Sequence, residues 1–389
     1  MNNLTMGVML DDCIMERGKT STAGSRILEG FVSPITATVV TRMTQAGYAV
    51  AGRTTGPEFG AYVMGCDADG GIYRAVKAVV DSTAGTAGLA ARSTGVIAAQ
   101  STGVTGVSAA FAFVNDVFGA YRRQAANNGL CCLRPTYGTV SRYGLIPTAP
   151  SMDQINIICD DLTRGFGLLS CIAGRDAGDG AMFPQEAYAY GKPDKLPTIG
   201  IPAHVFNRTD SKTRQTLTSF AERFRTVDIE IQYFDACRHV LSILGCGELS
   251  VAVSRYDGVK YGRRASGYAN LEELYVNTRT EGLGAAVKLA AITGAAVMTD
   301  DNYARYYDKA LRVRRLIKES LVFDGYDLIL LPCDIGDVYD NLSLYGLAPL
   351  AGLPSVSFGR NGCGLQLIAA AHNEGALLSA WEHAGEVRA

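Results

Sequence analysis

The run Leu133-Arg134-Pro135-Thr136-Tyr137-Gly138 decides the fold, together with the two runs that follow it. These are Ser141-Arg142-Tyr143-Gly144-Leu145 and Ser151-Met152-Asp153-Gln154. Counting back from Leu133 without a gap, a second pattern reads Asp116-Val117-Phe118-Gly119-Ala120-Tyr121-Arg122. The order and spacing of these short runs make residues 116–154 the most informative segment of the chain.

Length and composition indicate a soluble globular protein with a large core. The chain has 389 residues, of which 48% are hydrophobic and 19% are charged, and its formal net charge is −2. A near-neutral chain creates no extended field for nucleic acid or membrane, so RNA would be met through a local patch or through another polypeptide. No uninterrupted apolar run reaches the roughly 18 residues of a membrane span. We expect no membrane partner and a cytoplasmic location, with an organellar location after processing as the alternative.

The ten cysteines are scattered along the chain, and no Cys-x-x-Cys pair occurs. Several lie in apolar runs, such as Ile157-Ile158-Cys159. We interpret them as small buried hydrophobic side chains in a reducing compartment. No metal site is predicted, because none of the four histidines stands near paired thiols.

Helical and strand patterns alternate along the chain. Start signals at Pro34, Asp210 and Asn270 precede helical patterns. Helices are predicted over residues 34–47, 211–224, 270–283 and 301–322, and strands over 48–52, 198–202 and 327–332. This alternation predicts an α/β protein with a largely parallel sheet.

Two segments allow more than one interpretation. Residues 82–108 are rich in Gly, Ser, Thr and Ala, which is typical either of a plain turn-rich stretch or of the remnant of a catalytic loop. Arg312, Arg314, Arg315 and Lys318 form a basic cluster that is either a solvated helix face or a phosphate-contacting patch. The glycine-rich loops that mark nucleotide sites are absent from the sequence.

Further runs extend the pattern along most of the chain. They include Ser25-Arg26-Ile27-Leu28-Glu29, Pro57-Glu58-Phe59-Gly60, Thr278-Arg279-Thr280-Glu281-Gly282-Leu283-Gly284, Leu350-Ala351-Gly352-Leu353-Pro354-Ser355-Val356-Ser357 and Gly364-Leu365-Gln366-Leu367-Ile368. In these runs and in the 116–154 segment the chain resembles the amidase signature family. Within that family it is most similar to the A subunits of glutamyl-tRNA(Gln)/aspartyl-tRNA(Asn) amidotransferases.

The resemblance implies a fold and a role. The fold would be a single large α/β/α domain over residues 1–389, around a mixed, largely parallel central sheet and without the family's first helices. In the family, the A subunit hydrolyses glutamine and supplies ammonia to a partner that amidates Glu or Asp on tRNA. The implied partners are B- and C-type subunits, with tRNA met only indirectly and glutamine as a possible ligand. ATP and Mg would belong to a partner, so no cofactor is expected on this chain.

The resemblance also assigns the catalytic positions, which are not filled as in the family. Amide hydrolysis needs an activated nucleophile, a base and oxyanion donors, which the family supplies with a Ser–Ser–Lys arrangement. Here the nucleophile position is Ala120, the lysine position is Asp11 and the bridging-serine position is Val96. If the loop carries an insertion, Ser82 or Thr83 would take the bridging place. An aspartate with an ordinary pKa near 4 is a weak base at neutral pH.

The substrate-binding positions are partly kept. Arg279 matches the arginine that pairs with the α-carboxylate of glutamine in the family, or alternatively forms a structural salt bridge. The family's aspartate for the α-amino group falls on Leu342, and Asp340 stands two residues away.

Three functions are compatible with these residues. The first is a diverged A-type chain that is catalytically inactive and acts as a scaffold or partner subunit. The second is an active amidase or glutaminase with relocated chemistry, for instance through Ser101 or Ser108. The third is a non-enzymatic structural protein that retains the fold. We expect no glutamine hydrolysis by the family mechanism, because members of such a triad act as a unit.

Overall fold

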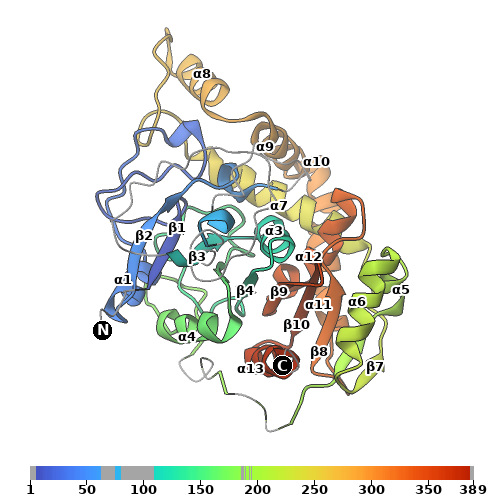
Figure 1. Cartoon of the computed structure of the whole chain (residues 1–389). Helices are drawn as coiled ribbons and strands as arrows, with labels where there is room; N and C mark the ends of the chain where they lie inside the picture. Colours follow the sequence, from blue (N-terminus) through green and yellow to red (C-terminus); the bar gives the residue numbers. More distant parts are fainter. Residues whose placement is uncertain are drawn as a thin grey trace.

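The computed structural model describes residues 6–62, 75–79, 109–184, 188, 190–191, 193 and 195–385. Within these residues one ten-stranded sheet runs through the molecule in the order β2-β1-β3-β5-β4-β9-β10-β8-β6-β7 (Figure 1). The strands are β1 (Gly7–Asp11), β2 (Ala49–Thr54), β3 (Ala109–Asn115), β4 (Cys131–Arg134), β5 (Ile155–Cys159), β6 (Ile199–Ile201), β7 (Thr226–Asp228), β8 (Leu328–Pro332), β9 (Ser355–Arg360) and β10 (Cys363–Ala369).

The sheet is mixed, as expected, but its parallel pairs are confined to its two sides. Strands β2, β1 and β3 are parallel to their neighbours in that group, and so are β8, β6 and β7. Every pair between β3 and β8 is antiparallel. The expectation of a largely parallel sheet is therefore wrong for the centre. The helix–strand alternation that predicted it governs the two sides, whereas β9 and β10 form a hairpin.

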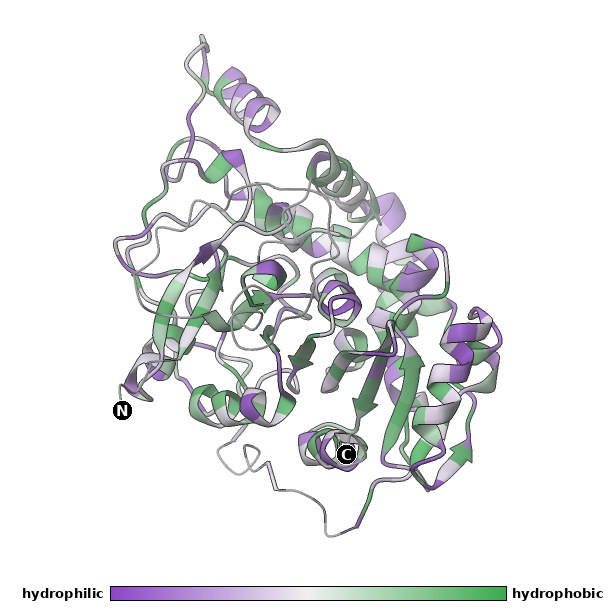
Figure 2. Ribbon diagram, viewed as in Figure 1, coloured by the Kyte–Doolittle hydropathy of each residue, from purple (hydrophilic) through white to green (hydrophobic). Residues whose placement is uncertain are grey.

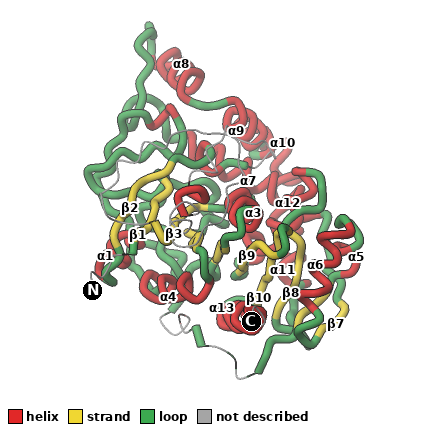
Figure 3. The backbone as a smooth tube through the Cα atoms, in the orientation of Figure 1, coloured by secondary structure: helices red, strands yellow, loops and turns green. Residues whose placement is uncertain are grey.

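Helices surround the sheet (Figures 1 and 3). Strands β1, β4, β5 and β8 are buried at every position, so both faces of the sheet are covered. The α-helices are α1 (Thr38–Gln45), α3 (Ala120–Asn127), α4 (Leu162–Ile172), α5 (Ala203–Phe206), α6 (Ser211–Ala221), α7 (Ala236–Ser254), α8 (Leu271–Gly282), α9 (Ala285–Val297), α10 (Asp300–Asn302), α11 (Asp308–Ser320), α12 (Val338–Ala351) and α13 (Glu374–Gly385). The structure also describes two 3₁₀ turns, η1 (Arg26–Leu28) and η2 (Glu58–Gly60), and a π-helical turn, η4 (Tyr303–Tyr307).

Helix α7 is the one helix in the described part of the chain with the length and composition to cross a membrane. It packs against α9, α11 and α12, and 56% of its most apolar window is buried inside the fold. This burial is that of a core helix. Figure 2 shows apolar residues along the central strands and a mixture of polar and apolar residues on the outer helices.

Most of the predicted helices form with shifted boundaries. Asp210 and Asn270 cap α6 and α8, and each accepts a backbone N–H three residues on. The helix predicted from Pro34 begins only at Thr38. The predicted helix 301–322 begins at Asp300, ends at Ser320 and contains the π-helical turn η4.

Some predictions fall outside the described residues. These are the ones on residues 82–108 and on the candidate residues within that range, namely Val96, Ser82, Thr83, Ser101 and Ser108. The single-domain boundaries at residues 1–389 stay a prediction.

Candidate functional site

The turn between β3 and α3 builds the frame of the candidate site. Asp116 accepts the backbone N–H groups of Gly119 (2.7 Å) and Arg122 (2.9 Å), and it forms an ion pair with Arg122 Nε at 3.2 Å. Gly119 has φ of +88°, and a Cβ there would lie 2.0 Å from Tyr345 Cγ, so only glycine fits. The matched residues Asp116, Gly119 and Arg122 thus form one turn that presents residue 120 at the start of α3.

The run Leu133-Arg134-Pro135-Thr136-Tyr137-Gly138, which we call the signature run, is held against this turn by Arg134, the second buried arginine. Arg134 donates to the carbonyl oxygens of Asp116 (3.1 Å) and Met152 (2.7 Å). Burial, with the nearby charge of Arg122, lowers the pKa of Arg134 to about 9. The residues that identified the fold are therefore the residues that hold the turn in place.

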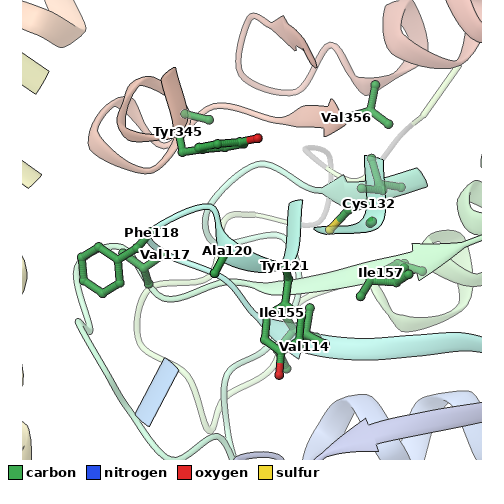
Figure 4. Close-up of a cluster of buried hydrophobic side chains, with 14 of the residues drawn as sticks. Val114, Val117, Phe118, Ala120, Tyr121, Cys132, Ile155, Ile157, Tyr345 and Val356 are labelled. Atoms are coloured by element: carbon green, nitrogen blue, oxygen red, sulfur yellow. The ribbon is translucent and has the colours of Figure 1, made fainter. Parts of the chain in front are cut away.

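Ala120 occupies the position at which this turn would present a nucleophile. It is the first residue of α3, only 6% of it is exposed, and its side chain is a methyl group. In the view of Figure 4 it lies between the buried side chains of Tyr345 and Tyr121. A methyl group cannot attack a carbonyl carbon, so residue 120 supplies no nucleophile.

Asp11, at the lysine position, contacts Tyr121 rather than a serine. Its Oδ2 accepts a hydrogen bond from the Tyr121 hydroxyl, and its Oδ1 accepts the Cys13 N–H at 3.1 Å. Burial, and then the charge of neighbouring Asp12, raise the pKa of Asp11 to about 7. Burial and Asp11 also raise the pKa of Tyr121 well above its usual value. The ordinary pKa near 4 that was expected for Asp11 is therefore not met, and both of its carboxylate oxygens accept hydrogen bonds.

A small hollow lies beside Gly119. Phe118, Leu342 and Tyr345 help to line it, and its volume is about 10 Å³, close to the minimum needed for one water molecule. Leu342, at the position that the resemblance assigns to the family's aspartate, borders this hollow. Its apolar side chain offers no charge for an amino group. Tyr345 also donates to the carbonyl oxygen of Cys333 at 2.8 Å, which fixes its ring over the turn.

The two other substrate-binding candidates have partners within the fold. Arg279 donates to the carbonyl oxygens of Ser254 (2.7 Å) and Tyr256 (3.3 Å), so it caps the C-terminus of α7. Among the described residues the salt bridges of the fold do not include Arg279, so the contacts seen there are hydrogen bonds to carbonyl oxygens. Asp340 forms ion pairs with Arg208 (3.1 Å) and Arg238 (2.6 Å).

The basic cluster on α11 is not a single patch. Arg314 points inward and donates to Leu350 O (2.8 Å), Ser151 Oγ (2.7 Å) and Ser151 O (2.9 Å). Arg312 forms an ion pair with Asp308, and Arg315 forms one with Glu319. Each partner lies one helical turn away on the helix surface, and both arginine side chains are exposed. A phosphate-contacting patch that includes Arg314 is therefore wrong, and a solvated face describes Arg312 and Arg315.

The described part of the chain contains cysteines and other residues of the types that bind metal ions. The nine cysteines there are all free thiols, and seven of them are buried, as expected for small hydrophobic side chains. No group of three or more His, Cys, Asp or Glu side chains in that part could hold a metal ion.

The turn around Asp116, the two buried arginines and the order of the sequence runs are features that can be compared with those of known proteins. These comparisons establish the family to which the chain belongs. The sequence profile described as "Amidase" matches residues 6–337. The chain belongs to this family.

Within this family, the chain is similar to the A subunits of glutamyl-tRNA(Gln) amidotransferases. The A subunit of glutamyl-tRNA(Gln) amidotransferase from Lachnoclostridium phytofermentans is 31% identical, over 92% of this chain and 75% of the relative. The crystal structure of the corresponding A subunit from Thermotoga maritima superposes with a TM-score of 0.71 at 22% identity, covering 96% of this chain and 81% of that one. Native peptide amidase from Stenotrophomonas maltophilia gives 0.73 at 22% identity, covering 99% and 83%. The two structures confirm the single α/β domain, and the sequence relatives confirm the similarity to A subunits.

Sequence reasoning missed the aromatic residues that fill this site. It identified Ala120 and Asp11, but not the Tyr121–Asp11 hydrogen bond or the position of Tyr345. The only available signal was the aromatic side chain directly after Ala120. Its meaning depends on the neighbouring positions of β1 and β3, which the sequence does not show.

Proposed function

We propose that this chain is an amidotransferase component of the A type that does not hydrolyse glutamine and serves as a scaffold or partner subunit. The relatives at 31–33% identity are A subunits of glutamyl-tRNA(Gln) amidotransferase. The single observation that carries the loss of activity is Ala120, held at the start of α3 by an otherwise intact turn.

The surroundings of Ala120 support the same proposal. Asp11 has both carboxylate oxygens hydrogen-bonded, Asp340 is held by two arginines, and Arg279 caps a helix. An amide substrate would need a nucleophile and a base, and neither the methyl group of Ala120 nor the hydrogen-bonded Asp11 matches what the family supplies.

In the proposed complex, B- and C-type subunits bind this chain, and a partner holds ATP, Mg and the tRNA. The nitrogen would come from free ammonia or from another amidase. Because the described cysteines are free and mostly buried, we place the complex in a reducing compartment such as the cytoplasm.

The test is reconstitution with B- and C-type subunits. We expect the chain to co-purify with them, and we expect the complex to amidate Glu-tRNA(Gln) with ammonium chloride but not with glutamine. Glutamine-driven amidation that a fluorophosphonate probe blocks by labelling this chain would instead favour a relocated nucleophile. Absence of any complex would favour a structural protein that has kept the fold.

A further inference from the structure

A second cavity, of about 290 Å³, lies where four segments of the chain meet beside Phe183, which comes from a fifth segment. The signature run after β4, the turn between α12 and β9, the segment after β10 and the end of α11 form its walls. Hydrogen bonds join three of these walls: Tyr137 N–H donates to Gly352 O at 3.2 Å, and His372 N–H donates to Thr136 Oγ1 at 3.0 Å. The cavity is therefore a fixed part of the fold.

Its lining combines apolar surface with a lysine ammonium group. Phe183, Leu321, Phe323 and Leu353 supply apolar walls. Lys318, an exposed residue in the last turn of α11, also lines the cavity and brings a positive charge to its edge. An apolar pocket with one polar or charged group is the usual composition of a small-molecule site.

The backbone is strained at this cavity. Phe323 lines it with φ of +51°, and His372, which follows the lining residue Ala371, has φ of +64°. His372 also packs its ring edge-on against Phe183, with centroids 4.5 Å apart. A bulky non-glycine residue in the left-handed region costs energy, and such residues cluster at ligand sites.

We propose that this cavity binds a small carboxylic acid with an apolar body, about the size of an arylacetate. The apolar walls would bury the body, and the Lys318 ammonium would pair with the carboxylate. The volume of about 290 Å³ lies just below the usual range of about 300–1,000 Å³ for ligand pockets, which suits a small ligand. The cavity shares no lining residue with the hollow beside Gly119, so this proposal is independent of the amide chemistry.

Titration of the full chain with phenylacetate, followed by calorimetry, tests the proposal, with the neutral phenylacetamide as the matched ligand. We expect saturable binding of phenylacetate and weaker binding of the amide. Lys318→Met keeps the apolar stem and should weaken phenylacetate binding roughly tenfold, the factor that corresponds to about 1.4 kcal/mol, while leaving phenylacetamide unchanged. Lys309→Met, an exposed change on the same helix outside the cavity, should alter neither affinity.

Ala370→Phe, which fills the cavity, should abolish binding of both ligands, and Lys318→Met keeps the test valid if that variant fails to fold. No saturable heat with phenylacetate would overturn the proposal. So would equal effects of Lys318→Met and Lys309→Met, because the charge would then act from a distance and not in the cavity.

Discussion

The buried carboxyl group of Asp11 ties the stability of the fold to pH. Its pKa in the folded chain is about 7 against an ordinary value of 3.8, because burial and Asp12 disfavour its charge. Between about pH 4 and pH 7 the folded chain therefore binds a proton that the unfolded chain has lost, and the free energy of unfolding falls as pH rises. The pKa of Glu58, Asp153 and Glu248 is also raised by burial, so they act in the same direction.

Asp11→Asn should remove this contribution while leaving groups that can hydrogen-bond to Tyr121 and Cys13. At pH 8 the variant should be more stable than the parent by about 1–3 kcal/mol, since each pKa unit corresponds to about 1.4 kcal/mol. The difference should shrink toward pH 4. Urea unfolding across this range measures it, and a constant difference at every pH would contradict the account.

The stability of a Gly119→Ala variant tests how tightly the turn before residue 120 is packed. Gly119→Ala should destabilise the fold by more than about 3 kcal/mol, because overpacking and a positive φ act together. The added Cβ would lie 2.0 Å from Tyr345 Cγ. Gly129→Ala is the matched control: its φ is +75° and nothing lies within 4 Å, so only the backbone cost of about 1–2 kcal/mol applies. Equal losses in the two variants would show that Tyr345 does not pack as described.

At the scale of elements, Arg314 joins α11 to α12 and to the run Ser151-Met152-Asp153-Gln154. Its three hydrogen bonds reach Ser151 and Leu350, and Ser151 in turn donates to Glu248 Oε2 through its backbone at 2.8 Å. Removing the part-buried guanidinium of Arg314 leaves the carbonyl oxygens of Leu350 and Ser151 without their charged donor.

Arg314→Met should therefore cost about 3 kcal/mol of stability. Arg315→Met removes only an exposed ion pair with Glu319 and should leave the unfolding midpoint unchanged. Chemical unfolding of both variants checks the contrast. A larger loss in Arg315→Met than in Arg314→Met would reverse the assignment of the two side chains.

Elements with local signals could be predicted from the sequence, whereas long-range pairing could not. Asp210 and Asn270 mark helix starts through their own side chains, and β8 forms where a short apolar run ends at Pro332. The antiparallel centre of the sheet depends on which distant strands meet, and helix–strand alternation does not specify that. The Asp11–Tyr121 contact escaped prediction for the same reason, since it joins the end of β1 to the start of α3.

At the scale of the whole molecule, the residues that build the fold around the candidate site are different from the residues at the family's catalytic positions. The residues that build the turn, Asp116, Gly119 and Arg122, are retained, while the residues that would react are replaced. Because the frame does not need the nucleophile, the loss of glutamine hydrolysis that we propose is compatible with an intact fold.

Restoring one group should not restore activity. Ala120→Ser places a hydroxyl at the start of α3, but Asp11 remains hydrogen-bonded to Tyr121 and Cys13, so no free base faces it. We expect no glutamine turnover and no fluorophosphonate labelling of the new serine. Labelling of that serine would show that a base reaches residue 120 after all.

The most direct test is hydrolysis of isotope-labelled glutamine by the purified, unaltered chain. The vacant nucleophile position at Ala120 predicts glutamate formation no faster than in buffer alone. Turnover above that background, abolished by a fluorophosphonate probe that labels a serine of this chain, would contradict the central claim.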